Sequence, residues 1–376
     1  MESGKVTVAK QKKYKNIKIK LGGMNFMKDV FERLREKLDE LGAGFPKSSN
    51  GWDVGLLKNL YTDEEAELFI QMTDELETPE QVARRMGGDI EILTEMLYSM
   101  SKKGILYRVH DGSEIKYSTI PFVVGIWEFQ KNNTNQEFFM NTFPYLMSDF
   151  GPALFKEDLP VLRYIPIKSE LNTNLEIMKY DDATDIIKSS QRVSLAECMC
   201  RKLQRLAGND CGHSLETCIQ FDEWADYYVE NGLAQYISNE EALEKLKIAE
   251  DENLVLEVAN SQKPVLMCMC CSCCCGPMSI LKTFPGKANN LLSNFFCKYD
   301  PEKCIKCDKC IEVCPMDARS RNEDVLSINL EKCVGCGICV KNCSGKASQL
   351  KEKQNQYIPA ETMFDSFKQI EDKRKQ

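Results

Sequence analysis

The sequence lacks several features that mark familiar classes of protein. Its 376 residues contain no run of about 18 apolar residues, so no membrane span is predicted. Only two histidines are present, His110 and His213, which leaves few candidates for Ser–His or Cys–His catalysis. No G-x-G-x-x-G dinucleotide fingerprint follows a strand pattern, and no G-x4-G-K-[ST] phosphate loop occurs. The sequence therefore gives no nicotinamide, flavin or phosphate-loop signature.

An export signal and a strong positive charge are also missing. The first twenty residues hold seven lysines and one glutamate but no apolar segment, so we expect a cytoplasmic protein. The net charge of −8 argues against the whole chain being a nucleic-acid binder, although it leaves one module free to be one. Hydrophobic residues make up 43% and charged residues 28%, which is typical of a globular chain.

Cysteine, in contrast, is abundant. The chain has 19 cysteines, and 15 of them lie between Cys268 and Cys343. A disulfide framework is not expected, because a reducing cytoplasm keeps thiols free. Sites rich in thiolate and poor in imidazole suit iron–sulfur clusters or zinc. The sequence therefore predicts a metal protein.

Two cysteine runs of the same spacing lie in the last quarter of the chain. The first, Cys304 to Pro315, reads C-x2-C-x2-C-x3-C-P, and it recurs 29 residues later from Cys333 to Cys343. Three thiolates two residues apart can wrap one face of a cubane, and the fourth then points to the other cluster. Ser344 stands where the second run would have its proline, which affects a turn rather than a ligand.

This spacing resembles the bacterial dicluster ferredoxin domain over about residues 297–350. We expect one [4Fe–4S] cluster on Cys304, Cys307, Cys310 and Cys343. The second is expected on Cys333, Cys336, Cys339 and Cys314. The alternative is two four-cysteine zinc sites, which is disfavoured because zinc sites more often pair two distant C-x2-C knuckles.

Lysines crowd the first run but not the second. Lys303, Lys306 and Lys309 lie around it, opposed by Asp308. Net charge near a cluster is one determinant of its potential, so we expect the Cys304–Cys310 cluster to be reduced first. The alternative is that these lysines are ordinary solvated side chains.

A second group of cysteines precedes the repeat. Six of the eight positions from Cys268 to Cys275 are cysteine. In an extended chain they would alternate between two faces with three on each, so any cluster needs ligands from elsewhere. The candidate ligands in the middle of the chain are Cys198, Cys200, Cys211, Cys218, Cys268, Cys270, Cys271, Cys273, Cys274 and Cys275, and Cys297 is also unassigned.

At least one further iron–sulfur cluster in this region is the favoured expectation. Three alternatives stay open: reactive thiols in the dense run, Cys218 as a core residue on an aromatic helical face, and a zinc site on Cys198, Cys200, Cys211 and His213. The Cys274-Cys275-Gly276 element resembles the CCG element of heterodisulfide-reductase-type domains, but only one copy stands here.

Capping signals and periodicity predict the remaining elements. A Thr62–Glu65 capping pair, Pro79 after Thr78 and an Asp111–Gly112 turn predict helices followed by a hairpin, an order that resembles a winged-helix domain. Residues from Cys218 to Tyr228 show helical spacing, and a helix at 239–250 and a strand at 254–258 are expected.

The chain is thus predicted to be α+β and multidomain. We expect a basic flexible arm (1–22), a winged-helix-like domain (23–120), a mostly helical, cysteine-rich middle domain (121–296), a dicluster ferredoxin domain (297–350) and a charged tail (351–376).

Residues 180–350 as a whole resemble an uncharacterised group of cytosolic iron–sulfur proteins from anaerobes, which share a C-x-C-R element, a dense cysteine run and a dicluster ferredoxin. This resemblance supports a metal protein without naming a reaction. The leading hypothesis is an electron-transfer protein or oxidoreductase subunit whose dicluster domain passes single electrons between a redox partner protein and the middle domain. A redox-sensing DNA-binding regulator is a second hypothesis, weakened by Asp89, Glu91 and Glu95 on its expected recognition helix. A reductase with an unusual cluster near Cys268–Cys275 is a third.

Overall fold

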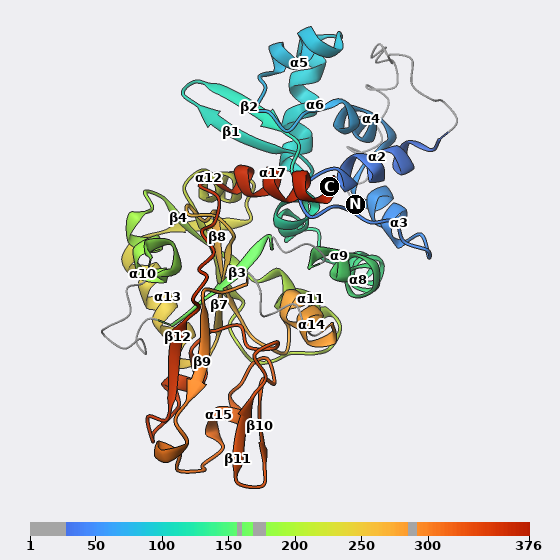
Figure 1. Ribbon diagram of the computed structural model, residues 1–376. Coiled ribbons are helices and arrows are strands. Elements are labelled where there is room, and N and C mark those ends of the chain that lie inside the picture. The colour runs from blue at the N-terminus through green and yellow to red at the C-terminus, as the bar shows by residue number, and fades with distance from the viewer. Residues whose placement is uncertain (1–27, 156–159, 168–177, 285–291) are drawn as a thin grey trace. The chain divides into compact units, whose positions relative to one another are not determined.

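The structure is a computed structural model that describes residues 28–155, 160–167, 178–284 and 292–376 (Figure 1). The basic arm predicted at 1–22 lies outside the described residues. The chain divides into two compact units, residues 1–130 and 131–376, and each is described by itself. Among the described residues, no helix combines the length and the apolar character needed to cross a bilayer.

The first unit consists of helices followed by a hairpin. Its elements are α2 (Val30–Asp39), α3 (Trp52–Leu60), α4 (Asp63–Gln71), α5 (Pro79–Met86), α6 (Ile90–Lys102), β1 (Tyr107–Asp111), β2 (Glu114–Ser118), an irregular segment (Phe122–Ile126) and α7 (Trp127–Phe129). The expected capping boxes form at Thr62 and Thr78, and Pro79 lies in the first turn of α5. The three helices and hairpin predicted for 61–120 are confirmed, whereas α3 was not predicted. Their identity as a winged-helix domain stays a prediction.

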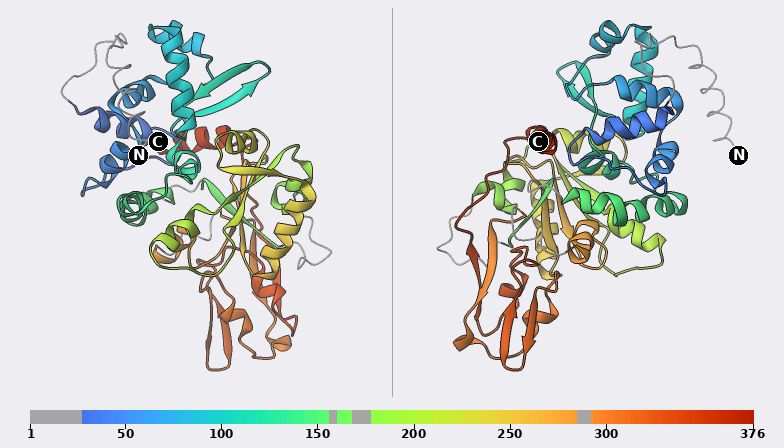
Figure 2. Two further views of the ribbon diagram at one scale, coloured as in Figure 1. Left: turned by 180° about the vertical axis from the view of Figure 1, so that it is seen from behind. Right: turned by 45° about the vertical axis from the view of Figure 1, so that its right-hand side comes forward.

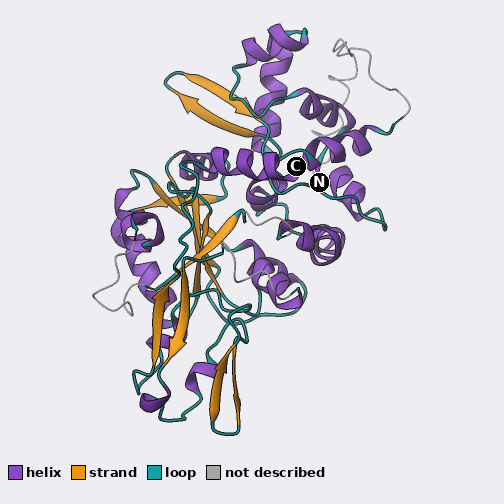
Figure 3. Ribbon diagram, viewed as in Figure 1, coloured by secondary structure: helices purple, strands orange, loops and turns teal. Residues whose placement is uncertain are grey.

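The second unit is built on a six-stranded antiparallel sheet, seen in orange in Figure 3. The strand order is β3 (Leu162–Ile165), β7 (Val255–Ala259), β8 (Leu266–Cys270), β5 (Glu216–Phe221), β4 (Val193–Glu197) and β6 (Ala234–Ile237). Its helices include α8 (Gln136–Tyr145), α9 (Gly151–Leu154), α10 (Ala183–Ser189), α11 (Met199–Leu206), α12 (Glu223–Glu230), α13 (Asn239–Asp251) and α14 (Gly276–Thr283). The middle region therefore has more helix than strand, as expected, but it is centred on a sheet of which the sequence analysis predicted only the strand at 254–258.

The periodicity between Cys218 and Tyr228 misled the sequence prediction. Cys218 lies on strand β5, and helix α12 begins only at Glu223. A strand that ends just before a helix starts can place apolar residues three or four apart by chance. The expected helix near 239–250 and strand near 254–258 are confirmed as α13 and β7.

The two faces of this sheet differ in chemistry. One face carries Leu256, Val258, Met267 and Met269, which pack with apolar residues of α10 and α13 into a buried core. Because side chains alternate along a strand, Glu257, Cys268 and Cys270 project from the other face. Figures 1 and 2 show α10 and α13 on one side of the sheet and α11 and α14 on the other.

The C-terminal part of this unit is made of short elements. Strand β9 (Phe295–Tyr299) pairs with β12 (Ser348–Glu352), and β10 (Arg319–Asn322) pairs with β11 (Val325–Ile328). Two one-turn helices, α15 (Lys309–Glu312) and α16 (Ile338–Lys341), lie between them in sequence. The charged tail expected at 351–376 contains regular structure. It begins within β12 and forms helix α17 (Met363–Arg374), in which Met363, Phe367 and Ile370 are buried.

Candidate metal centres

The two cysteine runs near the C-terminus adopt matching backbone conformations. Lys306 and Asp308 in the first run have φ angles of 56° and 58°, and Gly335 and Gly337 have 64° and 82° at the equivalent positions of the second. Each pair of left-handed residues turns the chain so that it enters α15 or α16 directly. Close packing also requires glycine at position 335, because a Cβ atom there would lie 2.3 Å from the Phe295 carbonyl oxygen.

One cavity gathers thiols from both runs. Cys314, the last cysteine of the first run, lines it together with Cys333, Cys336 and Cys339 of the second. These are the four residues that the sequence assigns to one cluster through the crossing of the fourth thiolate. The structure thus places the crossing residue where that assignment requires it, and its role as a ligand remains a prediction.

Backbone N–H groups point at the fourth sulfur of each run. The Ala318 N–H donates to Cys314 Sγ at 3.3 Å, and the Ala347 N–H donates to Cys343 Sγ at 3.2 Å. Both donors lie four residues after their cysteine, so the repeat extends beyond the ligands. Burial acts against the thiolate of Cys343, but the Ser348 and Ala347 N–H groups outweigh it and lower the pKa of Cys343. At Cys314, in contrast, burial outweighs the N–H groups of Ala318 and Met316 and raises the pKa, so the thiolate is favoured at Cys343 alone of these two.

Residues 296–344 match the family model of the 4Fe-4S dicluster domain. The chain carries an iron–sulfur domain near its C-terminus. No curated protein and no solved structure matches the chain. The comparisons therefore bear on this domain alone.

A buried arginine and an additional cysteine lie inside the dicluster domain, and the sequence analysis assigned neither. Arg319 Nη2 donates to Cys297 Sγ at 2.5 Å and Nη1 donates to Ser348 Oγ at 3.0 Å. Cys297 Sγ in turn lies 3.3 Å from Cys339 Sγ. Burial alone would lower the pKa of Arg319, but the nearby thiols of Cys339, Cys297 and Cys310 outweigh burial. The pKa of Arg319 is therefore raised above its ordinary value. The charge of Arg319 thus acts on cysteines from both expected ligand sets, and no spacing rule singles this residue out.

The lysines of the first run are paired with carboxylates. Lys306 lies 2.7 Å from Asp324 and Lys309 lies 2.9 Å from Glu312, and both lysines are about half exposed. Lys303 pairs with Asp300 at 3.4 Å. The positive charge that the sequence places around this loop is therefore largely balanced, which favours the reading of these lysines as ordinary surface.

The dense run from Cys268 to Cys275 is extended only as far as Cys270, so the alternation between two faces that a fully extended run would show stops there. Strand β8 ends at Cys270, the chain turns, and α14 begins at Gly276. The turn divides the cysteines into two groups. Cys271, Cys273 and Cys274 form a group with Cys211, and Cys270 and Cys275 form one with Glu257.

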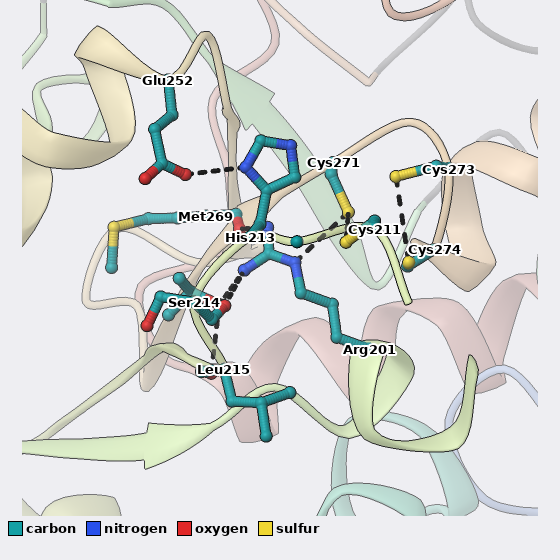
Figure 4. A network of polar contacts seen from close by, with 12 residues as sticks. Arg201, Cys211, His213, Ser214, Leu215, Glu252, Met269, Cys271, Cys273 and Cys274 are labelled. Carbon is teal, nitrogen blue, oxygen red and sulfur yellow. Dashed lines mark hydrogen bonds and ion pairs between the residues drawn. The ribbon is translucent and has the colours of Figure 1, made fainter. Parts of the chain in front are cut away.

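The first group, which we call the tetrathiol site, consists of Cys211, Cys271, Cys273 and Cys274. Its four sulfurs all lie within 4.8 Å of one another (Figure 4). Arg201 of the C-x-C-R element is buried beside it, and its Nε donates to Cys271 Sγ at 3.2 Å. His213 is engaged elsewhere, since its Nδ1 lies 2.7 Å from Glu252. The alternative zinc set of Cys198, Cys200, Cys211 and His213 is thus not brought together.

The second group, which we call the buried thiol site, lies on the opposite face of the sheet. Glu257 Oε2 is 3.4 Å from Cys270 Sγ and 3.8 Å from Cys275 Sγ. Cys218 pairs with Cys268 across β5 and β8, which corrects its expected place on a helix. Cys198 and Cys200 lie at the start of α11 and complete the set. Cys200 is close to the start of α14, since a Cβ atom added to Gly276 would lie 3.9 Å from Cys200 Sγ.

The charges of the buried thiol site are unusual. Burial and the neighbouring Cys268 raise the pKa of Glu257 to about 8. The Cys200 thiol, acting against burial, lowers the pKa of Cys198 to about 6. Burial disfavours the charge on Lys131, yet Cys218, Cys198 and Cys268 raise its pKa. The site therefore combines thiolate character with a buried ammonium group. Sequence patterns alone do not reveal that Lys131 and Glu257 belong to it.

Proposed function

We propose that the protein is an iron–sulfur electron-transfer protein or oxidoreductase subunit that passes single electrons through two [4Fe–4S] clusters in its dicluster domain. The observation that carries this proposal is the cavity in which Cys314 joins Cys333, Cys336 and Cys339. By the same repeat, Cys304, Cys307, Cys310 and Cys343 would hold the first cluster. The clusters would supply one-electron redox chemistry.

The residues around these thiolates would set the potential and the direction of transfer. The Ala318 and Ala347 N–H groups stabilise negative charge on Cys314 and Cys343. Arg319 brings a buried positive charge to both ligand sets. Because added negative charge is stabilised by such groups, they favour the reduced state of a bound cluster.

A pair of double variants tests the ligand assignment. If Cys314 and Cys336 hold the same cluster, anaerobically prepared Cys314→Ala/Cys336→Ala should lose only about four irons, as Cys336→Ala alone does. The matched variant Cys314→Ala/Cys307→Ala should lose the iron of both clusters, about eight atoms. Iron and acid-labile sulfide are measured for each protein, with circular dichroism as a check on folding. The assignment of Cys314 to the second cluster is contradicted by the reverse pattern, in which adding Cys314→Ala to Cys307→Ala causes no further loss of iron.

We infer that the buried thiol site holds a further iron–sulfur cluster, to or from which the dicluster domain passes electrons. In its support, six thiols interact with one another and with Lys131 at this site, and polynuclear clusters need several thiolates whose charge is offset. Glu257 would offer an oxygen ligand, whereas ferredoxin cubanes are usually held by cysteine thiolates, which keeps a reductase with an unusual cluster as the second candidate.

Iron content tests this third site. The intact protein should contain more than about eight irons per chain, and Cys268→Ala should lower the count while Cys307→Ala removes only dicluster iron. A count of about eight in the intact protein, unchanged by Cys268→Ala, would rule out the third cluster. Substrate-dependent reoxidation that Glu257→Gln abolishes would favour the reductase over plain electron transfer.

The DNA-binding alternative gains no specific support from the first unit. The exposed positions of α6 include Glu91 and Glu95 alongside Ile90 and Tyr98, and only Lys102 is basic among them. Phosphate contacts dominate affinity for DNA, so a recognition helix is expected to be basic or neutral. Salt-dependent retention of the full-length protein on duplex DNA would restore this hypothesis.

A further inference from the structure

The tetrathiol site is assembled from two loops that are remote in sequence. Cys211 lies in the loop between α11 and β5, and the other three cysteines lie in the turn between β8 and α14. Cys211 Sγ is 3.9 Å from Cys271 Sγ, and Cys273 Sγ is 3.8 Å from Cys274 Sγ. Figure 4 shows the four thiols directed toward one another beside Arg201.

These separations match the coordination sphere of one ion. Four thiolates at about 2.3 Å from a tetrahedral metal stand about 3.8 Å from one another. The ligand sulfurs of a cubane are further apart, because two iron atoms lie between any two of them. The dicluster domain shows this difference, since none of its eight expected ligands belongs to a group of three or more within 4.8 Å among the described residues.

Arg201 supplies the surroundings that a charged tetrathiolate requires. The side chain is 1% exposed, and its Nε donates to Cys271 Sγ at 3.2 Å. The guanidinium is fixed by Thr217 Oγ1 at 2.6 Å and by the carbonyl oxygens of Ser214 at 2.7 Å and Met269 at 2.8 Å. A positive group held in this way orients a thiolate and offsets part of the charge of a site with four of them.

We propose that Cys211, Cys271, Cys273 and Cys274 bind a single Zn²⁺ ion that ties the α11–β5 loop to the β8–α14 turn. Four sulfur ligands in a tetrahedron leave no open position, which is the mark of a structural site rather than a catalytic one. Among divalent metals that such a site accepts, zinc binds more tightly than ferrous iron. This inference is independent of the electron-transfer proposal, because it assigns a redox-inert ion to residues outside the dicluster domain.

Metal analysis of two matched variants tests the proposal. Cys273 and Cys307 are both exposed, so replacing either by alanine removes one candidate ligand without opening the core. Anaerobically purified protein should contain one zinc per chain. Cys273→Ala should lose that zinc and keep its iron, and Cys307→Ala should lose about four irons and keep the zinc. The Cys307→Ala arm reports on the dicluster domain, so failure of one proposal is distinguishable from failure of the other.

Two outcomes would overturn the zinc assignment. One is loss of iron from Cys273→Ala, whether one atom or several, and the other is absence of zinc from the intact protein. A measurement on the unmodified chain guards against misfolded variants. Cells supplied with Co²⁺ in place of zinc should yield protein with the ligand-field absorption of tetrahedral cobalt thiolate, and its absence would equally overturn the proposal.

Discussion

Two buried arginines contact cysteine sulfur, and each lies at a different candidate metal site. Arg201 touches Cys271 at the tetrathiol site, and Arg319 touches Cys297 in the dicluster domain. A buried guanidinium keeps its charge at all accessible pH values and is poorly screened, so it acts on a nearby thiolate more strongly than a surface lysine does. We therefore expect the buried Arg319 to affect the clusters of the dicluster domain more than the lysines around Cys304–Cys310 do.

Replacement of Arg319 should lower the dicluster potentials. Arg319→Gln removes a buried positive charge that favours the reduced, more negative state, and we expect a decrease on the order of 60 mV, a tenfold change in a one-electron equilibrium. Lys306→Glu serves as the control. It alters an exposed group already paired with Asp324, so it should shift the potential much less. Redox titration followed by EPR measures both, and an equal or larger shift in Lys306→Glu would contradict the assignment.

At the scale of elements, the sequence predicted correctly those helix starts that depend on residues close together in the chain. The capping boxes at Thr62 and Thr78 marked the starts of α4 and α5 correctly, because a cap depends on residues within four positions. The sheet of the second unit was missed because its strands pair across long separations, as β5 does with β8. Cys218 therefore looked helical, although its pairing with Cys268 is set by tertiary contacts.

The same distinction explains the candidate sites. The ligand sets expected for the dicluster domain follow from spacing within each run, so the sequence alone could propose all eight cysteines. Cys211 joins Cys271 only because the α11–β5 loop and the β8–α14 turn meet in the fold, and no spacing encodes that meeting. Glu257 and Lys131 were missed for the same reason, since nothing in the sequence sets these two apart from other carboxylates and lysines.

Loss of the α4 cap should loosen that helix measurably. In Thr62→Ala the Glu65 N–H loses the hydroxyl that it donates to at 3.2 Å, a change that typically costs about 1 kcal/mol. Amide hydrogen exchange across Asp63–Gln71 should then accelerate about fivefold. Thr94→Ala, at an exposed interior position of α6, is the matched control and should leave exchange nearly unchanged, since alanine is the better helix former. Equal acceleration in both variants would mean that the cap contributes nothing specific.

At the scale of the whole molecule, all 19 cysteines lie in the second unit, between Cys198 and Cys343. The first unit instead has an apolar core of its own, with Leu57, Phe69 and Leu97 fully buried. Metal binding contributes free energy to the fold of the part that supplies the ligands, because the unfolded chain holds no assembled site. The two units should therefore respond differently when metal is removed.

Removal of iron and zinc should unfold part of the second unit and spare the first. After anaerobic treatment with a chelator, amides of β9, β12 and the β8–α14 turn should lose protection from hydrogen exchange, because their loops are held mainly through thiolate ligands. Amides of α4 and α6 should keep their protection, since their core contains no cysteine. Mass spectrometry of the exchanged protein resolves these segments in one experiment. Loss of protection in α4 and α6 at the same chelator concentration would show that the first unit depends on the metal centres for its stability, and full retention in the β8–α14 turn would show that no metal supports the tetrathiol site.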